Sequence, residues 1–338
     1  MRSLIEKIVR IPGPSGYEAQ IRQAVRSEVE PLADEVTVDA LGNLIARKGR
    51  AEQGGMRIML AAHMDEIGIM VTHIDEYGFA RFTNIGGVHA QNCPGGRVRF
   101  LNGAMGVIGV ERLENQTTTP SLEQMYLDLG VSSRKDSPVR VGDVAAFERP
   151  FIDLGERLVS KALDDRIGVA ILIETLRALH ASPNEVTFVF SVQEEVGVRG
   201  ATTAAYAINP DLGLAVDVTG TGDTPKSVKM EVGLGKGPAI KVRDAGMLAD
   251  PRVVNWMVQT AEAARIPYQM EILERGGTDA RAIQLTRAGV PAGCLSIPCR
   301  HVHSPSEMVD YGDVQHAVRL LAELVSRPVV LTSQGWSG

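Results

Sequence analysis

Short, nearly continuous apolar runs alternate along the chain with segments whose apolar residues recur at helical spacing. The runs cover residues 57–62, 186–192, 212–216 and 290–297. Runs of this kind are typical of strands that are buried on both faces of a parallel sheet, although periodicity alone does not distinguish them from buried helix. Helical periods cover residues 167–179, 253–264 and 314–325. Strands that alternate with helices predict an α/β layered core.

The first fifty residues predict two helices followed by two strands. The helices are expected over residues 5–9 and 17–29, and the first should stop at Pro12 because proline cannot continue a helix. The strands are expected over residues 36–39 and 43–47. This segment therefore adds peripheral elements to the layered core.

Residues 66–156 follow a different pattern. They contain many short β-like pieces and many glycines, and hardly any helical period. We therefore expect a small all-β domain over residues 66–156, inserted into a discontinuous α/β domain made of residues 1–65 and 157–338.

Composition narrows the class of protein. The 338 residues carry 35 lysines and arginines against 41 aspartates and glutamates, a net charge of −6, and only 4% are aromatic. A basic face or a stacking platform for nucleic acid is therefore not expected. No stretch approaches the roughly 18 apolar residues of a membrane span. The odd cysteine count, at Cys93, Cys294 and Cys299, favours a reducing compartment, and we expect a cytoplasmic location.

Residues able to bind a metal stand at the ends of the four apolar runs. The candidates are His63 with Asp65, the pair Glu194 and Glu195, Asp217, and the pair His301 and His303. Because ligands gather at the carboxyl ends of strands in open α/β sheets, these side chains could meet in one crevice. Asp164 and Asp165 stand just ahead of the helix expected at residue 167 and could join them.

Each candidate also has a purely structural interpretation. Asp164 or Asp165 could be a helix N-cap, and Asp217 could form an Asx-turn. The glutamate pair could lie in a solvated turn, and His301 competes with His303 because on a strand the two would face the same way. The set as a whole favours a metal site, because burying so many carboxylates without compensation is costly.

Two further features concern the neighbourhood of these residues. Glu194 and Glu195 would point to opposite faces of a regular strand, so both reach one site only if the strand breaks there. Gly197 makes such a turn plausible. The glycine-rich sequence of residues 276–280 (GGTDA) is expected to form a loop on the rim of the site.

Six ordered motifs together resemble one protein family. They are HMDEIG (63–68), ALDDR (162–166), QEEVGVRGA (193–201), AVDVT (215–219), GGTDA (276–280) and HSPSEM (303–308). In this order they resemble the tetrahedral (TET) or glutamyl-aminopeptidase family of dinuclear metallo-aminopeptidases, also labelled cellulase-M-like. The resemblance covers nearly the whole chain. It implies a zinc-peptidase-like α/β/α sandwich in which the inserted all-β domain serves dimerisation.

The resemblance also assigns roles to the candidates. Asp164 would bridge two divalent metal ions, zinc or cobalt in the first place and manganese as a further option. His63 and Asp217 would complete one metal site, and Glu195 and His303 the other. Glu194 would be the general base, and Asp65 would orient His63.

The function implied is the release of N-terminal residues from peptides by a homo-oligomer, expected to be a dodecamer. Two other enzymatic functions stay open: an N-deacylase or other amidohydrolase on small amides, and an endoglucanase-type glycoside hydrolase. A metal-binding assembly without activity is a fourth interpretation. The sequence does not choose the preferred N-terminal residue or the native metal.

Overall fold

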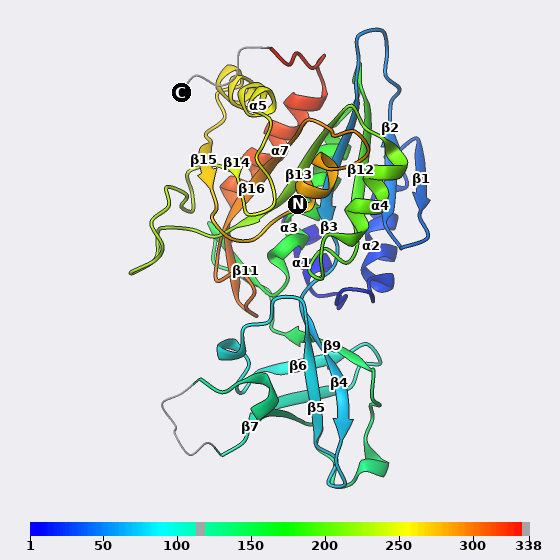
Figure 1. Ribbon diagram of the computed structural model, residues 1–338, viewed down its shortest axis with the longest axis vertical. Coiled ribbons are helices and arrows are strands. Elements are labelled where there is room, and N and C mark those ends of the chain that lie inside the picture. The colour runs from blue at the N-terminus through cyan, green and yellow to red at the C-terminus, as the bar shows by residue number, and fades with distance from the viewer. Residues whose placement is uncertain (113–118, 333–338) are drawn as a thin grey trace.

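The chain folds into two parts, one mixed α/β and one all-β (Figure 1). The computed structural model describes residues 1–112 and 119–332. The larger part is built on an eleven-stranded sheet, and the smaller part is a closed barrel of six strands. This is the predicted fold class, a layered α/β core with an inserted all-β unit.

The four apolar runs form the centre of the large sheet. They become β3 (Arg57–His63), β12 (Glu185–Ser191), β13 (Leu212–Thr219) and β16 (Ala292–Arg300). In the order β12-β3-β13-β16 these strands pair in parallel, as predicted. Nearly all their side chains are buried, which explains why they appear in the sequence as continuous apolar runs.

Shorter strands extend this sheet on both sides. On one side lies the predicted hairpin of β1 (Glu35–Val38) and β2 (Leu44–Lys48), where β2 pairs antiparallel with β12. On the other side lie β17 (Glu307–Asp310), β11 (Arg157–Ser160) and β10 (Ile152–Asp153), all antiparallel to their neighbours. The remaining strands, β14 (Ala239–Arg243) and β15 (Gln269–Ile272), attach to β16.

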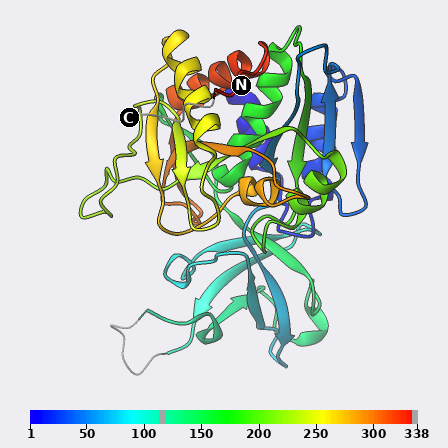
Figure 2. The same cartoon turned by 45° about the horizontal axis from the view of Figure 1, so that its top comes forward.

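Helices cover both faces of the sheet (Figure 2). Successive residues of β3 show this, since Ile58 and Leu60 pack in one hydrophobic cluster and Met59 and Ala61 in another. The first cluster includes residues of α1 (Arg2–Val9), α2 (Ala19–Val29), α3 (Leu163–Ala178), α5 (Pro251–Ala263) and α7 (Tyr311–Val325). The second includes residues of α4 (Arg199–Ile208) and α6 (Asp279–Gln284). The core is therefore an α/β/α sandwich.

The barrel lies below the sandwich in Figure 1 and has a hydrophobic core of its own. Its strands are β4 (Gly68–Ile74), β5 (Ala80–Ile85), β6 (Arg97–Phe100), β7 (Met105–Val110), β8 (Met125–Asp128) and β9 (Val144–Glu148). They close in the order β4-β5-β8-β7-β6-β9. The chain pairs with the large sheet again from Ile152, and the division at residues 66 and 156 stays a prediction.

None of the described helices is long and apolar enough to cross a membrane.

Candidate metal centre

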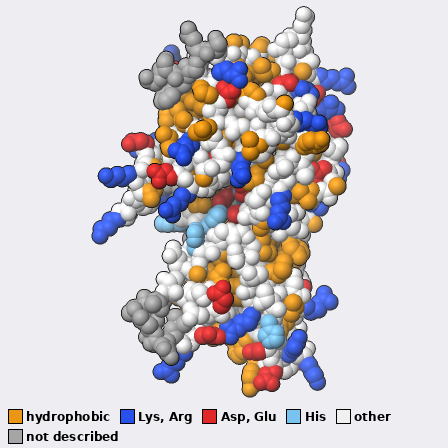
Figure 3. Space-filling view, viewed as in Figure 1, with side chains coloured by type: hydrophobic (Ala, Val, Ile, Leu, Met, Phe, Trp, Pro, Cys, Tyr) orange, Lys and Arg blue, Asp and Glu red, His pale blue; other side chains and the backbone are white. Residues whose placement is uncertain are grey.

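The candidate ligands converge where the parallel strands end, in the hollow between the sandwich and the barrel. His63 is the last residue of β3, and in the register of the sheet it lies opposite Ser191, the last residue of β12. The residues that follow β3 and β12 therefore start at the same edge of the sheet. Figure 3 shows acidic and histidine side chains gathered in this hollow.

Asp164 lies between two histidines from distant parts of the chain. Its Oδ1 is 3.1 Å from Nε2 of His63, and its Oδ2 is 3.3 Å from Nε2 of His303. Each carboxylate oxygen thus faces a different imidazole. This is the arrangement that a carboxylate bridging two metal ions needs.

Two groups of potential ligand atoms share Asp164. In each group these atoms lie within 4.8 Å of one another. The first group adds His63 and Asp217, whose Oδ1 is 3.9 Å from Nε2 of His63. The second adds Glu195 and His303, whose Oε2 and Nε2 are 3.3 Å apart. All five residues expected to bind metal are therefore brought together.

Asp164 and Asp165, at the start of α3, have different hydrogen-bond partners. Both residues have non-helical backbone angles, with φ −77° and ψ 107° at Asp164 and φ −116° and ψ 36° at Asp165. Asp165 accepts hydrogen bonds from the backbone N–H groups of Gly168 (3.1 Å) and His63 (3.2 Å). The capping interpretation thus fits Asp165, and the side chain of Asp164 faces the histidines.

Strand β12 ends before Glu194 and Glu195, which is the condition that the sequence set for both side chains to reach one site. β12 ends at Ser191, Gln193 has a positive φ of 56°, and the N–H of Gly197 donates to the carbonyl of Glu194 in a turn. Glu195 can therefore join the second ligand group while Oε2 of Glu194 lies 4.0 Å from Nε2 of His63.

Asp65 connects the glutamate pair with His63. Its carboxylate accepts the backbone N–H groups of Glu194 (3.0 Å) and Glu195 (3.2 Å) and the hydroxyl of Ser15 (2.6 Å). Nδ1 of His63 lies 3.1 Å from the carbonyl oxygen of Asp65 and 3.6 Å from its Oδ1. Acceptors at Nδ1 fix the ring so that Nε2 faces the site.

His303, rather than His301, reaches the cluster. β16 ends at Arg300, and both histidines have a positive φ, 60° at His301 and 59° at His303. The expectation that the two would face the same way on a strand is therefore wrong, because neither is on the strand. His301 is exposed.

The site holds more negative charge than its own cations balance. Among the described residues, the ion pairs within 4.0 Å of Asp164, Asp217, Glu194 and Glu195 involve histidines alone. Burial raises the pKa of Glu194 and of Asp217 well above the usual range, and neighbouring carboxylates raise both further. Burial also acts on Asp164, but its two histidines outweigh it and lower its pKa. Divalent cations would relieve this repulsion, so the donor set fits them.

Two buried carboxylates at the site were not among the expected residues. The sequence predicts that Asp279 lies in a rim loop, but Asp279 is the first residue of α6, is buried and accepts a hydrogen bond from Ser191 at the end of β12. Glu307 is buried beside Asp164 and His303. Both lie in motifs of the resemblance, GGTDA and HSPSEM, and that was the only signal for them in the sequence.

The barrel forms one wall of the centre. A β-carbon at Gly87 would lie 2.4 Å from Nδ1 of His303, so only glycine fits there. Nδ2 of Asn92 donates to the carbonyl of His303 (3.4 Å), and the rings of His89 and His303 are 5.9 Å apart. The loop after β5 therefore encloses the second ligand group.

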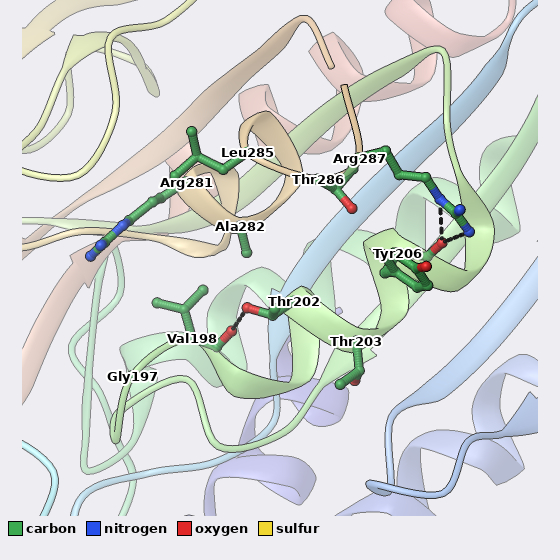
Figure 4. A pocket seen from close by; sticks show the side chains of 10 residues that line it. All are labelled: Gly197, Val198, Thr202, Thr203, Tyr206, Arg281, Ala282, Leu285, Thr286 and Arg287. Carbon is green, nitrogen blue, oxygen red and sulfur yellow. Dashed lines mark hydrogen bonds between the residues drawn. The ribbon is translucent and has the colours of Figure 1, made fainter. Parts of the chain in front are cut away.

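A groove of about 570 Å³ lies between α4 and α6, beside the turn that follows Glu195 (Figure 4). Its lining holds no acidic residue, histidine or cysteine: Gly197, Val198, Thr202, Thr203, Tyr206, Arg281, Ala282, Leu285, Thr286 and Arg287. Arg287 donates to the carbonyl of Tyr206, and Thr202 to that of Val198. The groove has no ligands for a metal, so the candidate chemistry lies in the hollow instead.

The chain is similar in sequence to curated aminopeptidases. It is 48% identical to a provisionally named aminopeptidase of Acetivibrio thermocellus, over 96% of this chain and 98% of that one. It is 38% identical to a lysyl aminopeptidase of Pyrococcus furiosus, over 95% of this chain and 96% of that one.

Solved structures agree in fold over almost the whole chain. An aminopeptidase of Desulfurococcus kamchatkensis matches with a TM-score of 0.92 and 40% identity, covering 96% of this chain and 94% of that one. The TET1 peptidase of Pyrococcus horikoshii matches with a TM-score of 0.88 and 33% identity, covering 96% and 98%. An endoglucanase of Thermotoga maritima matches with a TM-score of 0.80 and 32% identity, covering 95% and 96%.

The model of one peptidase family matches residues 42–320, which include every candidate ligand. The resemblance seen in the motifs is thereby confirmed, and the chain is a peptidase. It belongs to the M42 glutamyl aminopeptidase family.

Proposed function

We propose that this enzyme releases N-terminal residues from peptides, using two divalent metal ions and Glu194 as general base. Asp164 would bridge the ions, with His63 and Asp217 on one and Glu195 and His303 on the other. The observation that carries the proposal is the position of Asp164, whose two oxygens face two histidines. Nitrogen and oxygen donors suit zinc or cobalt, and manganese as a further option.

When bound, the ions would supply Lewis-acid activation of a water molecule and of the scissile carbonyl. Glu194 lies next to the first ligand group and belongs to neither group, so its carboxylate is free to take a proton. A pKa raised by burial suits this task, because the same group can return the proton to the leaving amine. Asp65 holds the backbone N–H of Glu194 and so positions it.

A free amino terminus suits a site that holds two divalent ions. The lone pair of an unprotonated α-amine could complete the coordination of one of the two ions, whereas the amide nitrogen of a blocked terminus is a poor metal ligand. The chain is similar both to a lysyl aminopeptidase and to a glutamyl aminopeptidase, so the similarity does not select the first residue.

The test is a panel of free and N-acetylated aminoacyl anilides with metal-free protein reloaded with zinc, cobalt or manganese. We expect metal-dependent cleavage of the free compounds alone. Glu194→Gln should keep the metal content and lose about 10²- to 10⁴-fold in kcat, whereas Glu195→Ala should lose metal. Full activity of Glu194→Gln would disprove the base assignment.

The same panel separates the alternatives. Cleavage of the acetylated compounds would indicate an N-deacylase. Because the chain is also similar to an endoglucanase, cellulose oligomers are a necessary control substrate. Glycosidases usually work with two carboxylates and no metal, so an endoglucanase should still hydrolyse these oligomers in the presence of a chelator. Metal uptake without hydrolysis of any compound would indicate a non-enzymatic assembly.

We further propose that the chain self-associates through the barrel into a dodecamer. The support is the TET1 peptidase of Pyrococcus horikoshii, which can assemble into a tetrahedron or a large octahedral shell. The molar mass of the native assembly in solution tests this, and a stable monomer would contradict it. Three buried, unpaired cysteines fit a reducing compartment, and fractionation of the native cells would test the proposed cytoplasmic location.

A further inference from the structure

Glu307 is a buried carboxylate that lies at the candidate metal centre without belonging to either ligand group. It stands at the start of β17. Its Oε2 accepts the backbone N–H of Asp164 at 2.9 Å, and its Oε1 accepts the backbone N–H of His303 at 3.0 Å. One side chain therefore holds the backbones of two candidate ligands that come from different segments.

The backbone of His303 needs this support most. Its φ is 59°, in the left-handed region that non-glycine residues rarely adopt, whereas Asp164 leaves the helical geometry of α3 for an ordinary extended conformation. Such left-handed conformations persist where the surroundings hold them in place. A carboxyl group has two oxygens, so the one side chain of Glu307 can accept from both N–H groups at once.

Two of the other three candidate ligands are held in the same manner. Asp65 accepts the backbone N–H groups of Glu195 and of its neighbour Glu194, and Asp165 accepts that of His63. Glu307 completes this set of outer carboxylates. It is the member that links the bridging Asp164 to the second ligand group.

We propose that Glu307 is a positioning residue that fixes Asp164 relative to His303 and thereby sets the affinity of the Asp164, Glu195 and His303 group for a divalent ion. The inference rests on the proposed two-metal function. Loss of a group that orients a metal ligand typically weakens metal binding by about 10- to 100-fold.

The test is calorimetric titration of metal-free Glu307→Gln with cobalt alone, with thermal melts of the metal-free protein beside it. Glutamine has nearly the same shape, but its amide nitrogen cannot accept one of the two N–H groups. We expect one of the two cobalt sites, which we assign to Asp164, Glu195 and His303, to lose about 10- to 100-fold in affinity. Activity should return towards the wild-type kcat when cobalt is raised.

Asp313 provides a matched control. It is also buried, and its two carboxylate oxygens accept the backbone N–H groups of Gly235 and Gly237, both at 2.7 Å, but it belongs to neither ligand group. Asp313→Asn should lower the melting temperature and leave both cobalt affinities unchanged. Glu307→Asp, which keeps the charge but shortens the reach, should weaken cobalt binding as Glu307→Gln does.

The outcomes separate the two proposals. If the wild-type protein binds two cobalt ions and Glu307→Gln binds both with unchanged affinity, the positioning role is wrong and the two-metal function stands. If the wild-type protein binds fewer than two ions, the two-metal function is wrong, and so is the positioning role of Glu307, which depends on it. If Glu307→Gln and Asp313→Asn weaken cobalt binding equally, the effect is general loss of stability, which also refutes the positioning role.

Discussion

Gly168 lies where α3 meets the candidate metal centre, and the packing there leaves no room for a side chain. A β-carbon at this position would lie 2.4 Å from Oδ1 and 2.5 Å from Oδ2 of Asp165. Replacing glycine by alanine inside a helix ordinarily stabilises a protein by about 0.5–1 kcal/mol. Here Asp165 would have to turn away from the N–H groups of Gly168 and His63.

We therefore expect Gly168→Ala to lower the free energy of unfolding by about 1–3 kcal/mol, the usual cost of leaving a buried donor unsatisfied. It should also weaken metal binding, because the N–H of His63 loses its acceptor. Gly220→Ala is the control, since a β-carbon there meets nothing within 4 Å. Denaturant unfolding and metal titration check both effects. A variant more stable than the wild type would show that Asp165 adapts.

Ligands that act through their side chains could be found from the sequence, whereas Glu307, which acts on two backbones, could not. His63 and Asp217 could be recognised because a polar residue that ends an apolar run stands out from its neighbours. Glu307 accepts from two backbone N–H groups, and a backbone N–H is common to nearly every residue. Strand spacing alone left His301 and His303 both open and the resemblance favoured His303; the backbone angles beyond the end of β16 explain why only His303 reaches the cluster.

At the scale of elements, the sequence could predict the strands that are buried on both faces. The four central strands are buried on both faces, so their apolar runs gave their type and nearly their bounds. Parallel pairing then brought their carboxyl ends to one edge. Closure of the barrel was not predictable, because pairs such as β4 with β9 join segments far apart in the chain.

At the scale of the whole molecule, there are two hydrophobic cores, and the candidate metal centre lies between the two parts that contain them. One core fills the sandwich and a separate one fills the barrel. All five candidate ligands come from the sandwich part of the chain: His63, Asp164, Glu195, Asp217 and His303. The barrel contributes a wall beside His303 and Glu195. Metal binding should therefore stabilise the sandwich selectively.

Removing the metal from the assembled wild-type protein tests this arrangement. A ligand present at a hundred times its Kd stabilises the folded state by about 2.7 kcal/mol. We expect a chelator to lower the melting temperature and to speed amide hydrogen exchange at the ligand segments, residues 162–166, 193–198 and 301–304. Exchange in the barrel strands should stay unchanged, because their core is independent. Glu194→Gln, which keeps the ligands, should respond to the chelator as the wild type does. Equal loss of protection in the barrel and in the sandwich would show that the two cores unfold together, and that the metals stabilise the molecule as one unit.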